Sequence, residues 1–153
     1  MQKIRLTKHF SFEAAHALHN YDGKCSRLHG HSYQLFVTVI GTPETDPDSP
    51  KLGMVMDFGL LKKIVNEEII DKYDHSVVLS EAVGFQGVDG NNQMFSNVIV
   101  VPFQPTCENM LIHFASKITP RLPEGVALWK LKLYETADSY AEWCREDNLP
   151  LQD

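Results

Sequence analysis

The first clear pattern is an alternation of apolar and polar residues between positions 4 and 16. One face of this stretch carries apolar side chains and ends in His16, with Lys8 as its single charged member. Such alternation is typical of a half-buried β-strand. A second alternating stretch runs from about His29 to Ile40, after a turn-rich segment at residues 20–24. Two long strands joined by a loop favour an antiparallel pair.

Two further stretches have the spacing of a buried helix face. A proline-rich, acidic loop over residues 42–51 precedes the first of them. Asp57 is the expected N-cap of the first helix, and Thr106 is that of the second, which Pro120 ends. The apolar residues at helical spacing are Leu61, Ile64, Val65 and Ile69 in the first helix, and Leu111, Phe114, Ala115 and Ile118 in the second.

The remaining pattern predicts a last long strand over Val126–Glu135. Short apolar runs at 77–79 and 98–101 indicate smaller strands, separated by a loop rich in Gly and Asn over 80–97, and we expect the acidic tail after Trp143 to be mobile. The order of elements predicts a single α+β domain over residues 1–153, an antiparallel sheet with helices on one face. On the last strand, one face is expected to carry Ala127, Trp129, Leu131, Leu133 and Glu135.

The bulk composition fits an ordinary globular domain and excludes several function classes. The chain has 153 residues, 43% of them hydrophobic, and its net charge of −6 gives no basic footprint for nucleic acid. No segment has the apolar core of a signal peptide or the length of a membrane span. Three cysteines form no CxxC pair, as in a reduced compartment. We therefore expect a cytoplasmic protein without nucleic-acid or membrane partners.

Three histidines form the strongest chemical signal. His29 and His31 share one strand face because side chains alternate with period two, and His16 ends the preceding strand. If the two strands pair as a hairpin, the three imidazoles converge. Neutral imidazoles suit Zn²⁺, and three protein ligands with an open fourth position are typical of a catalytic zinc site. The alternative is three separate polar residues near strand ends.

Several stretches together resemble the 6-pyruvoyltetrahydropterin synthase family. The three-residue gap between Cys25 and His29 is similar to that of the bacterial 6-carboxy-5,6,7,8-tetrahydropterin synthases of queuosine biosynthesis. The matching stretches lie in family order over nearly the whole chain: Phe10-Ser-Phe-Glu-Ala-Ala-His16, Cys25-Ser-Arg-Leu-His29-Gly-His31-Ser-Tyr33, Asp74-His75, Pro105-Thr-Cys-Glu-Asn109 and Glu135-Thr136.

The resemblance implies a tunnelling fold, in which a four-stranded antiparallel sheet is backed by two helices on one face. It also implies a homo-oligomer: trimers close the sheets into a barrel, and two trimers stack into a hexamer with active sites at subunit interfaces. Zinc held by His16, His29 and His31 is the implied cofactor. A small-molecule pterin triphosphate is the implied partner.

The resemblance also assigns a catalytic group of three residues. The cysteine that matches Cys25 is the general base that removes a proton from the substrate side chain; His75 relays the proton and Asp74 orients the His75 ring. The residues by themselves leave plainer interpretations open. A free cysteine is by default a small buried hydrophobe, and the dipole of a helix favours a histidine just beyond its C-terminus.

Glu135 is implied to anchor the pterin ring through the ring's N–H donors. A carboxylate that shares a strand face with apolar residues needs a partner if it is buried. The resemblance adds Thr106 and Glu108, at a helix N-terminus, as further polar contacts to the ring. The alternatives are a solvated carboxylate for Glu135, and a plain N-cap and dipole partner for Thr106 and Glu108.

These assignments predict a zinc-dependent carbon–oxygen lyase that converts 7,8-dihydroneopterin triphosphate to 6-carboxy-5,6,7,8-tetrahydropterin, with loss of acetaldehyde and triphosphate. The nearest alternative is 6-pyruvoyltetrahydropterin synthase, which eliminates triphosphate only. A zinc hydrolase with Glu135 as the base for a metal-bound water is a rival of another class. A non-catalytic pterin-binding or structural zinc protein is a third.

Overall fold

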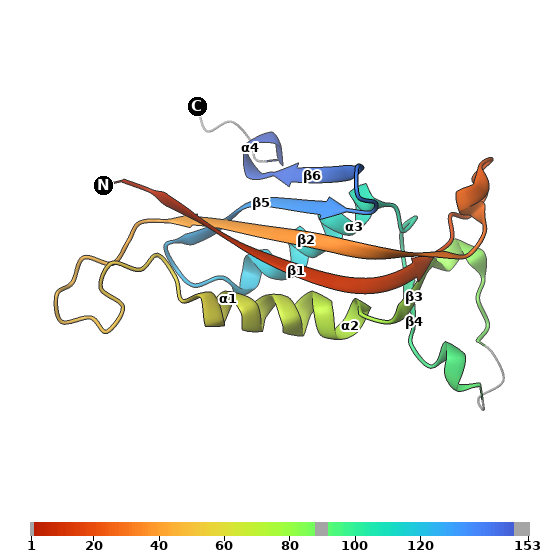
Figure 1. The fold of residues 1–153 in the computed structure, drawn as a ribbon, viewed down its shortest axis with the longest axis horizontal. Helices are drawn as coiled ribbons and strands as arrows, with labels where there is room; N and C mark the ends of the chain where they lie inside the picture. Colours follow the sequence, from red (N-terminus) through yellow and green to blue (C-terminus); the bar gives the residue numbers. More distant parts are fainter. Residues whose placement is uncertain (1, 88–91, 149–153) are drawn as a thin grey trace.

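Two long antiparallel strands form the frame of the computed structural model, which describes residues 2–87 and 92–148. Strand β1 (Ile4–His16) pairs along its whole length with β2 (His29–Gly41), so that Ile4 lies opposite Gly41 and His16 opposite His29. Figure 1 shows the pair crossing the full width of the molecule. This part of the prediction is confirmed.

The sheet has six strands in the order β4-β3-β1-β2-β5-β6. Strands β1, β2, β5 and β6 are antiparallel neighbours, whereas β3 runs parallel to β1 and β4 parallel to β3. The prediction of a four-stranded antiparallel sheet is therefore wrong in strand number and at one edge. The helical segment after β2 brings the chain back to the His16 end of β1, and β3 continues from there in the direction of β1, opposite to that of β2. The added elements are β3 (Ser76–Ser80), β4 (Val98–Val101), β5 (Val126–Tyr134) and β6 (Tyr140–Cys144).

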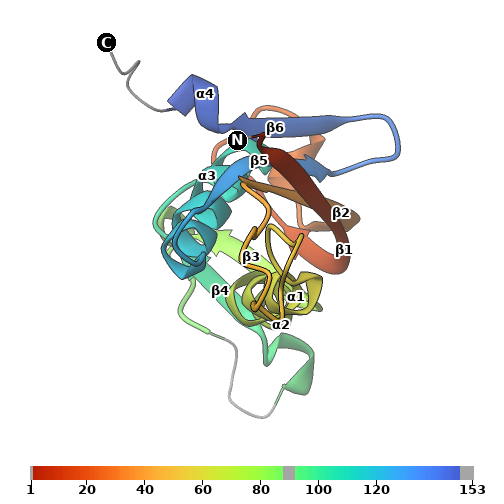
Figure 2. The ribbon, with the colours of Figure 1, turned by 90° about the vertical axis from the view of Figure 1, so that its left-hand side faces the viewer.

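Two helical segments cover the inner face of the sheet, as expected. The first joins α1 (Phe58–Val65), a π-helical turn (Asn66–Ile70) and α2 (Asp71–Tyr73). The second is α3 (Cys107–Ile118), followed by a 3₁₀ turn (Thr119–Arg121). Figure 2 shows both on the same side of β1, β2 and β5, within the curve of the sheet.

Side-chain caps begin both helices at the predicted residues. Asp57 accepts a hydrogen bond from the Gly59 N–H, and Thr106 accepts one from the Asn109 N–H. The remaining short elements are 3₁₀ turns at Lys24–Ser26, Glu81–Val83 and Gln93–Phe95, and α4 (Arg145–Asn148). No helix among residues 2–87 and 92–148 has the length and apolar character needed to cross a membrane.

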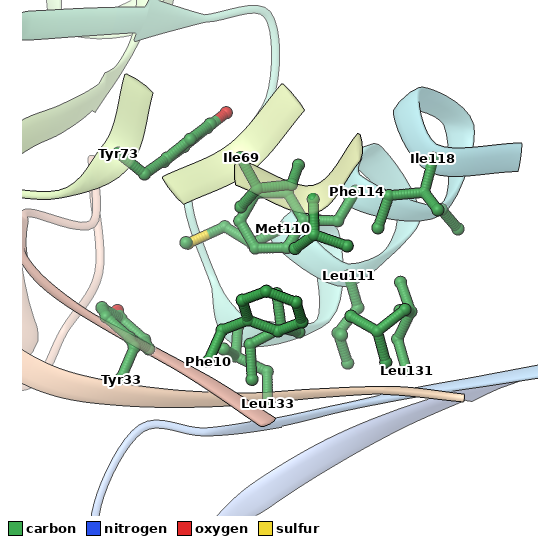
Figure 3. Close-up of a cluster of buried hydrophobic side chains, with 14 of the residues drawn as sticks. Phe10, Tyr33, Ile69, Tyr73, Met110, Leu111, Phe114, Ile118, Leu131 and Leu133 are labelled. Carbon is green, nitrogen blue, oxygen red and sulfur yellow. The ribbon is translucent and has the colours of Figure 1, made fainter. Parts of the chain in front are cut away.

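The hydrophobic core fills the space between the sheet and the helices (Figure 3). Phe12 on β1 stacks on Tyr33 of β2, with ring centroids 5.0 Å apart. Phe114 of α3 meets Phe12 and Tyr73 edge-on, at 6.2 and 5.0 Å. Such aromatic contacts add to the stabilisation that burial of apolar surface provides. The core therefore holds the histidine-bearing ends of β1 and β2 against both helical segments.

A β-bulge in β5 corrects the predicted face of that strand. Thr38 pairs with Lys130 and Val39 with Leu128, so Trp129 is an extra residue between two ladder pairs. Before the bulge Leu128 faces the core, and Ala127 and Trp129 do not. The Trp129 ring instead lies 4.2 Å from the Arg5 guanidinium. After the bulge the predicted parity holds, because Leu131 and Leu133 are fully buried.

Strand β6 is a second correction, because Val126–Glu135 was expected to be the last strand. The sequence of β6 is short and mixed and gives no strand pattern. The strand forms because it pairs with β5 as a hairpin. Part of the acidic tail forms α4. The remainder, residues 149–153, lies outside the described residues.

Replacing Phe114 by alanine should test the core. Phe114 is fully buried, so Phe114→Ala should lower the free energy of unfolding by about 3–5 kcal/mol through lost burial and a residual cavity. Urea denaturation followed by circular dichroism measures this change. The control is Ile112→Ala on the same helix, at a side chain that is 58% exposed, which should cost less than about 0.5 kcal/mol. A loss at Phe114 no larger than the control would contradict the packing described.

Candidate metal centre

Strand register brings the three predicted histidines together. His16 is the last residue of β1, and His29 opposite it is the first residue of β2. His31 follows two positions later on the same face. One ring nitrogen from each of the three lies within 4.8 Å of the other two. The predicted convergence is confirmed.

The hydrogen bonds of two of the rings point their free lone pairs at each other. His16 donates from Nδ1 to the Pro105 carbonyl, and His29 donates from Nδ1 to the Arg27 carbonyl, both at 2.7 Å. These bonds assign the ring protons to Nδ1 and leave each Nε2 as an acceptor. The two Nε2 atoms are only 3.1 Å apart. Two lone pairs at that distance repel unless a cation lies between them.

His31 completes the same arrangement. Its Nε2 is buried and has no hydrogen-bond partner among the described residues. A buried nitrogen without a partner is costly, and the cost is removed if the nitrogen ligates a metal. Three imidazole nitrogens directed at one point are the donor set that Zn²⁺ takes in catalytic sites. The residues therefore fit a bound zinc ion.

Burial favours the neutral, metal-binding form of two of these imidazoles, His16 and His31. It lowers the pKa of His16 and of His31 below the ordinary histidine value, because the protein interior disfavours the charged ring. The nearby Glu135 carboxylate acts against this effect on the pKa of both rings. Only the neutral ring offers a lone pair, so a lowered pKa reduces competition between protons and metal.

Glu135 lies beside the three rings, immediately after β5. Its Oε1 is 3.4 Å from His16 Nε2 and 3.8 Å from His31 Nε2. The hydroxyl of Tyr33, a buried core residue, donates to the same oxygen at 3.4 Å. Burial raises the pKa of that hydroxyl, so it remains a donor at neutral pH. The carboxylate thus has a neutral hydrogen-bond partner and keeps its second oxygen for other contacts.

A cavity of about 720 Å³ opens next to this carboxylate. Its volume lies in the usual range for a small-molecule site. Glu135, Thr136 and Ala137 form one wall, and outward-facing residues of β1, β2 and β5 form the others. His31 also lines the cavity, so a ligand there can reach both the carboxylate and the histidine cluster.

Asp74 and His75 form a separate pair at the end of α2. The Asp74 carboxylate lies 3.0 Å from His75 Nδ1 and accepts the Glu13 N–H at 2.9 Å. This bond, the largest cause, and the His75 ring lower the pKa of Asp74. The His75 backbone is left-handed, with φ of 56°, and its N–H donates to the Glu13 carbonyl. The pair is therefore held to β1 by main-chain bonds.

The His75 ring lies at the surface, beside a second cavity. His75 is 80% exposed and lines a second cavity of about 360 Å³, together with Glu13, Ser32 and others. This cavity shares only Gly30, His31 and Ser32 with the cavity beside Glu135. Among the residues that the structure describes, no hydrogen bond links the Cys25 thiol to His75. The predicted relay between them stays a prediction.

Cys25 lies in the 3₁₀ turn of the loop between β1 and β2, where its side chain is partly exposed. Burial raises the pKa of the other two thiols, those of Cys107 and Cys144. Cys107 is buried, donates to the Leu133 carbonyl, and has its pKa raised to about 12 by burial. Burial also raises the pKa of Cys144. Thiolate is the reactive form, so the raised pKa keeps these two thiols protonated at neutral pH.

In this structure Thr106 acts as an N-cap, and Glu108 lies where it can interact with the dipole of α3. The Thr106 hydroxyl caps α3, and Glu108 lies exposed in the first turn. Their contact with a substrate stays a prediction.

The sequence analysis missed two residues that support the site. Tyr33 had the right strand parity but no sign of a polar role, and the Pro105 carbonyl that holds His16 has no sequence signal.

The fold and the site together define a class of protein. It has a curled mixed sheet, helices on the inner face, and a three-histidine cluster beside a cavity for a small molecule. The family model described as 6-pyruvoyl tetrahydropterin synthase matches residues 5–146. The chain belongs to the 6-pyruvoyl tetrahydropterin synthase family.

Named relatives and a solved structure agree with this assignment. The chain is 34% identical to the 6-carboxy-5,6,7,8-tetrahydropterin synthase of Rickettsia felis, over 91% of this chain and 99% of the relative. It is 32% identical to the human 6-pyruvoyl tetrahydrobiopterin synthase, over 88% and 86% of the two chains. The structure of the Caenorhabditis elegans 6-pyruvoyl tetrahydropterin synthase is similar, with a TM-score of 0.66, 28% identity, and coverage of 94% and 96%.

The histidine cluster should bind one zinc ion per chain. His29→Ala removes one of three inward-pointing nitrogens, and we expect zinc affinity to fall on the order of 100-fold or more, because even outer partners of a metal ligand contribute 10–100-fold. Competition against a chelating dye measures the affinity, and elemental analysis gives the stoichiometry. His9→Ala, on the outer face of β1, is the control. Equal affinity in the two variants would rule out this cluster as the metal site.

Proposed function

We propose that this protein is a zinc-dependent carbon–oxygen lyase that converts 7,8-dihydroneopterin triphosphate and one water molecule to 6-carboxy-5,6,7,8-tetrahydropterin, acetaldehyde and triphosphate. The observation that carries the proposal is the set of three converging imidazole nitrogens beside the Glu135 carboxylate and its cavity. The name of the Rickettsia felis relative supports the product. A reduced, cytoplasmic setting would suit the free thiol that the chemistry uses.

His16, His29 and His31 would hold the zinc ion. When bound, zinc supplies Lewis-acid polarisation of the hydroxyl groups on the substrate side chain, which makes a neighbouring proton more acidic. The hydrogen bonds from His16 to Pro105 and from His29 to Arg27 keep both rings aimed at the centre. Preorganised ligands of this kind need little rearrangement when metal and substrate bind.

Glu135 would anchor the pterin ring at the wall of the larger cavity. Its carboxylate can accept hydrogen bonds from two adjacent ring N–H groups, a pairing that is both directional and charge-assisted. Tyr33 holds one oxygen from the core side, so the orientation of the carboxylate does not depend on the substrate. This contact fixes the reacting side chain of the substrate next to the histidine cluster.

Cys25 would remove the side-chain proton, and His75, oriented by Asp74, would relay it. The His75 ring lines a cavity together with residues of β1 and β2, and Cys25 is not among the described residues that line it. We therefore infer that a neighbouring copy of the chain supplies the relay pair. A trimer or hexamer with active sites at subunit interfaces meets this requirement.

The 6-pyruvoyl reaction is a second candidate, because the human relative carries that name. The two reactions share the elimination of triphosphate and differ in whether acetaldehyde is lost.

Product analysis tests the proposed reaction. The zinc-loaded protein, incubated with 7,8-dihydroneopterin triphosphate, should release acetaldehyde and triphosphate in equal amounts, measured by coupled enzymatic assay and chromatography. Cys25→Ala should lower kcat by about 100-fold or more, because it removes the general base. Cys144→Ala is the matched control. Triphosphate without acetaldehyde would favour the 6-pyruvoyl reaction, and substantial activity in Cys25→Ala would favour a zinc hydrolase.

Glu135→Gln should weaken substrate binding without loss of zinc. It keeps the size of the side chain but removes the charge that would pair with the pterin donors, so KM should rise by about 10- to 100-fold, the value of a charge-assisted hydrogen bond of about 1.5–3 kcal/mol. Steady-state kinetics and elemental analysis give the two quantities. Glu142→Gln, at an ion pair with lysines on β5, is the control. An unchanged KM would remove Glu135 from the pterin site.

A further inference from the structure

The side-chain amide of Gln104 forms a two-point clamp on the main chain of His19. The His19 N–H donates to Gln104 Oε1 at 3.0 Å, and Gln104 Nε2 donates to the His19 carbonyl at 2.8 Å. The two residues are 85 positions apart in sequence. An amide carries one donor group and one acceptor group, so it can satisfy both polar atoms of a residue that has no strand neighbour.

Gln104 is itself fixed at the start of α3. Its carbonyl accepts the Thr106 N–H at 2.8 Å and the Asn109 side-chain amide at 3.0 Å. The next carbonyl, that of Pro105, receives the His16 ring at 2.7 Å. Two consecutive residues therefore hold a ligand of the histidine cluster and the loop that leaves β1. This short stretch sets the position of the loop relative to the metal centre.

A main-chain hydrogen bond next to the clamped His19 connects it to Cys25. We call residues 17–28 the Cys25 loop. The Leu18 N–H donates to the Cys25 carbonyl at 2.9 Å, which closes the loop one residue before the clamped His19. Asn20, directly after the clamp, has a left-handed backbone with φ of 57°, a conformation that surrounding contacts must maintain.

The rest of the Cys25 loop has little packing of its own. Residues 19–22 and 26–28 are exposed. Apart from the bond between Leu18 and Cys25, the main-chain hydrogen bonds inside the loop are short-range turns, such as Ser26 N–H to the Gly23 carbonyl. Exposed segments with few buried contacts open locally at low free-energy cost. An anchor that joins such a loop to a rigid helix start therefore has a large influence on where its thiol lies.

We propose that Gln104 is a positioning residue for Cys25: its amide clamp on His19 holds the Cys25 loop against the histidine cluster. This inference rests on the proposed function only in taking Cys25 as the base. The clamp itself acts on the position of the thiol whether or not the substrate is a pterin. The clamp also gives a role to the segment between β4 and α3, in which Gln104 lies.

Thiol chemistry tests the clamp without any substrate. Gln104→Met keeps the length of the side chain and removes both hydrogen bonds. In the zinc-loaded protein, the rate of Cys25 alkylation by iodoacetamide should rise about three- to tenfold, because the loop opens more often. Peptide mass spectrometry follows each cysteine separately, so Cys107 and Cys144 serve as internal references. Gln86→Met is the control, since the amide of Gln86 donates to the carbonyl of Gly84, two residues away, and not to a distant part of the described chain.

Kinetics with the proposed substrate give the second readout. A displaced base should lower kcat by about 10- to 100-fold, since a displacement of about 1 Å can cost 100-fold, while KM and zinc content stay close to those of the parent protein. Gln104→Glu should act in the same direction with less risk to folding. Its carboxylate keeps an acceptor for the His19 N–H but places a second oxygen against the His19 carbonyl.

The outcomes separate the clamp from the proposed reaction. Faster alkylation of Cys25 in both Gln104 variants, with Cys107, Cys144 and zinc content unchanged, supports the clamp. Alkylation of Cys25 at the parent rate in both variants overturns it, whatever happens to kcat. If the parent protein does not turn over 7,8-dihydroneopterin triphosphate, the proposed function fails, and the alkylation rates alone still decide whether the clamp exists.

Discussion

The register between β1 and β2 is the constraint on which the rest of the site depends. Main-chain hydrogen bonds pair the two strands from Ile4 and Gly41 at one end to His16 and His29 at the other. Because side chains alternate from one face to the other, a slip of one residue would move the His16 ring to the opposite face from His29 and His31. The inward apolar residues of both strands prevent that slip, since it would expose Phe12 and Leu35. The same packing that stabilises the sheet therefore assembles the metal site.

The metal centre lies where the hydrophobic core ends, and burial has opposite consequences for different groups there. It lowers the pKa of His16 and His31, which favours the neutral rings that bind metal. It raises the pKa of the Tyr33 hydroxyl and of the Cys107 thiol, which keeps both protonated. Tyr33 connects the hydrophobic core to the site, because its ring stacks in the core and its hydroxyl reaches Glu135. The position of the Glu135 carboxylate is thus tied to core packing.

One part of the site lies on paired strands, and the other part lies on segments that connect the helices and strands. The histidine cluster and Glu135 lie on or directly beside paired strands, whereas Cys25 lies in a loop and the Asp74–His75 pair follows a helix end. Both of these connections are held by bonds from distant residues: Gln104 to His19, and Glu13 to His75 and Asp74. Long-range hydrogen bonds therefore fix these connections, which strand pairing does not reach.

Local patterns in the sequence determined the two long strands, both helix caps and the convergence of three histidines, because alternation and capping depend on near neighbours along the chain. The match of dispersed motifs also identified the family before the site was visible. Only the tertiary structure decided the parallel edge, the bulge at Trp129 and strand β6, because each depends on which strand lies alongside. It alone showed that Tyr33, Pro105 and Gln104 support the site, and that His75 faces a different cavity from Glu135. Those facts depend on contacts between residues far apart in sequence, which no local pattern records.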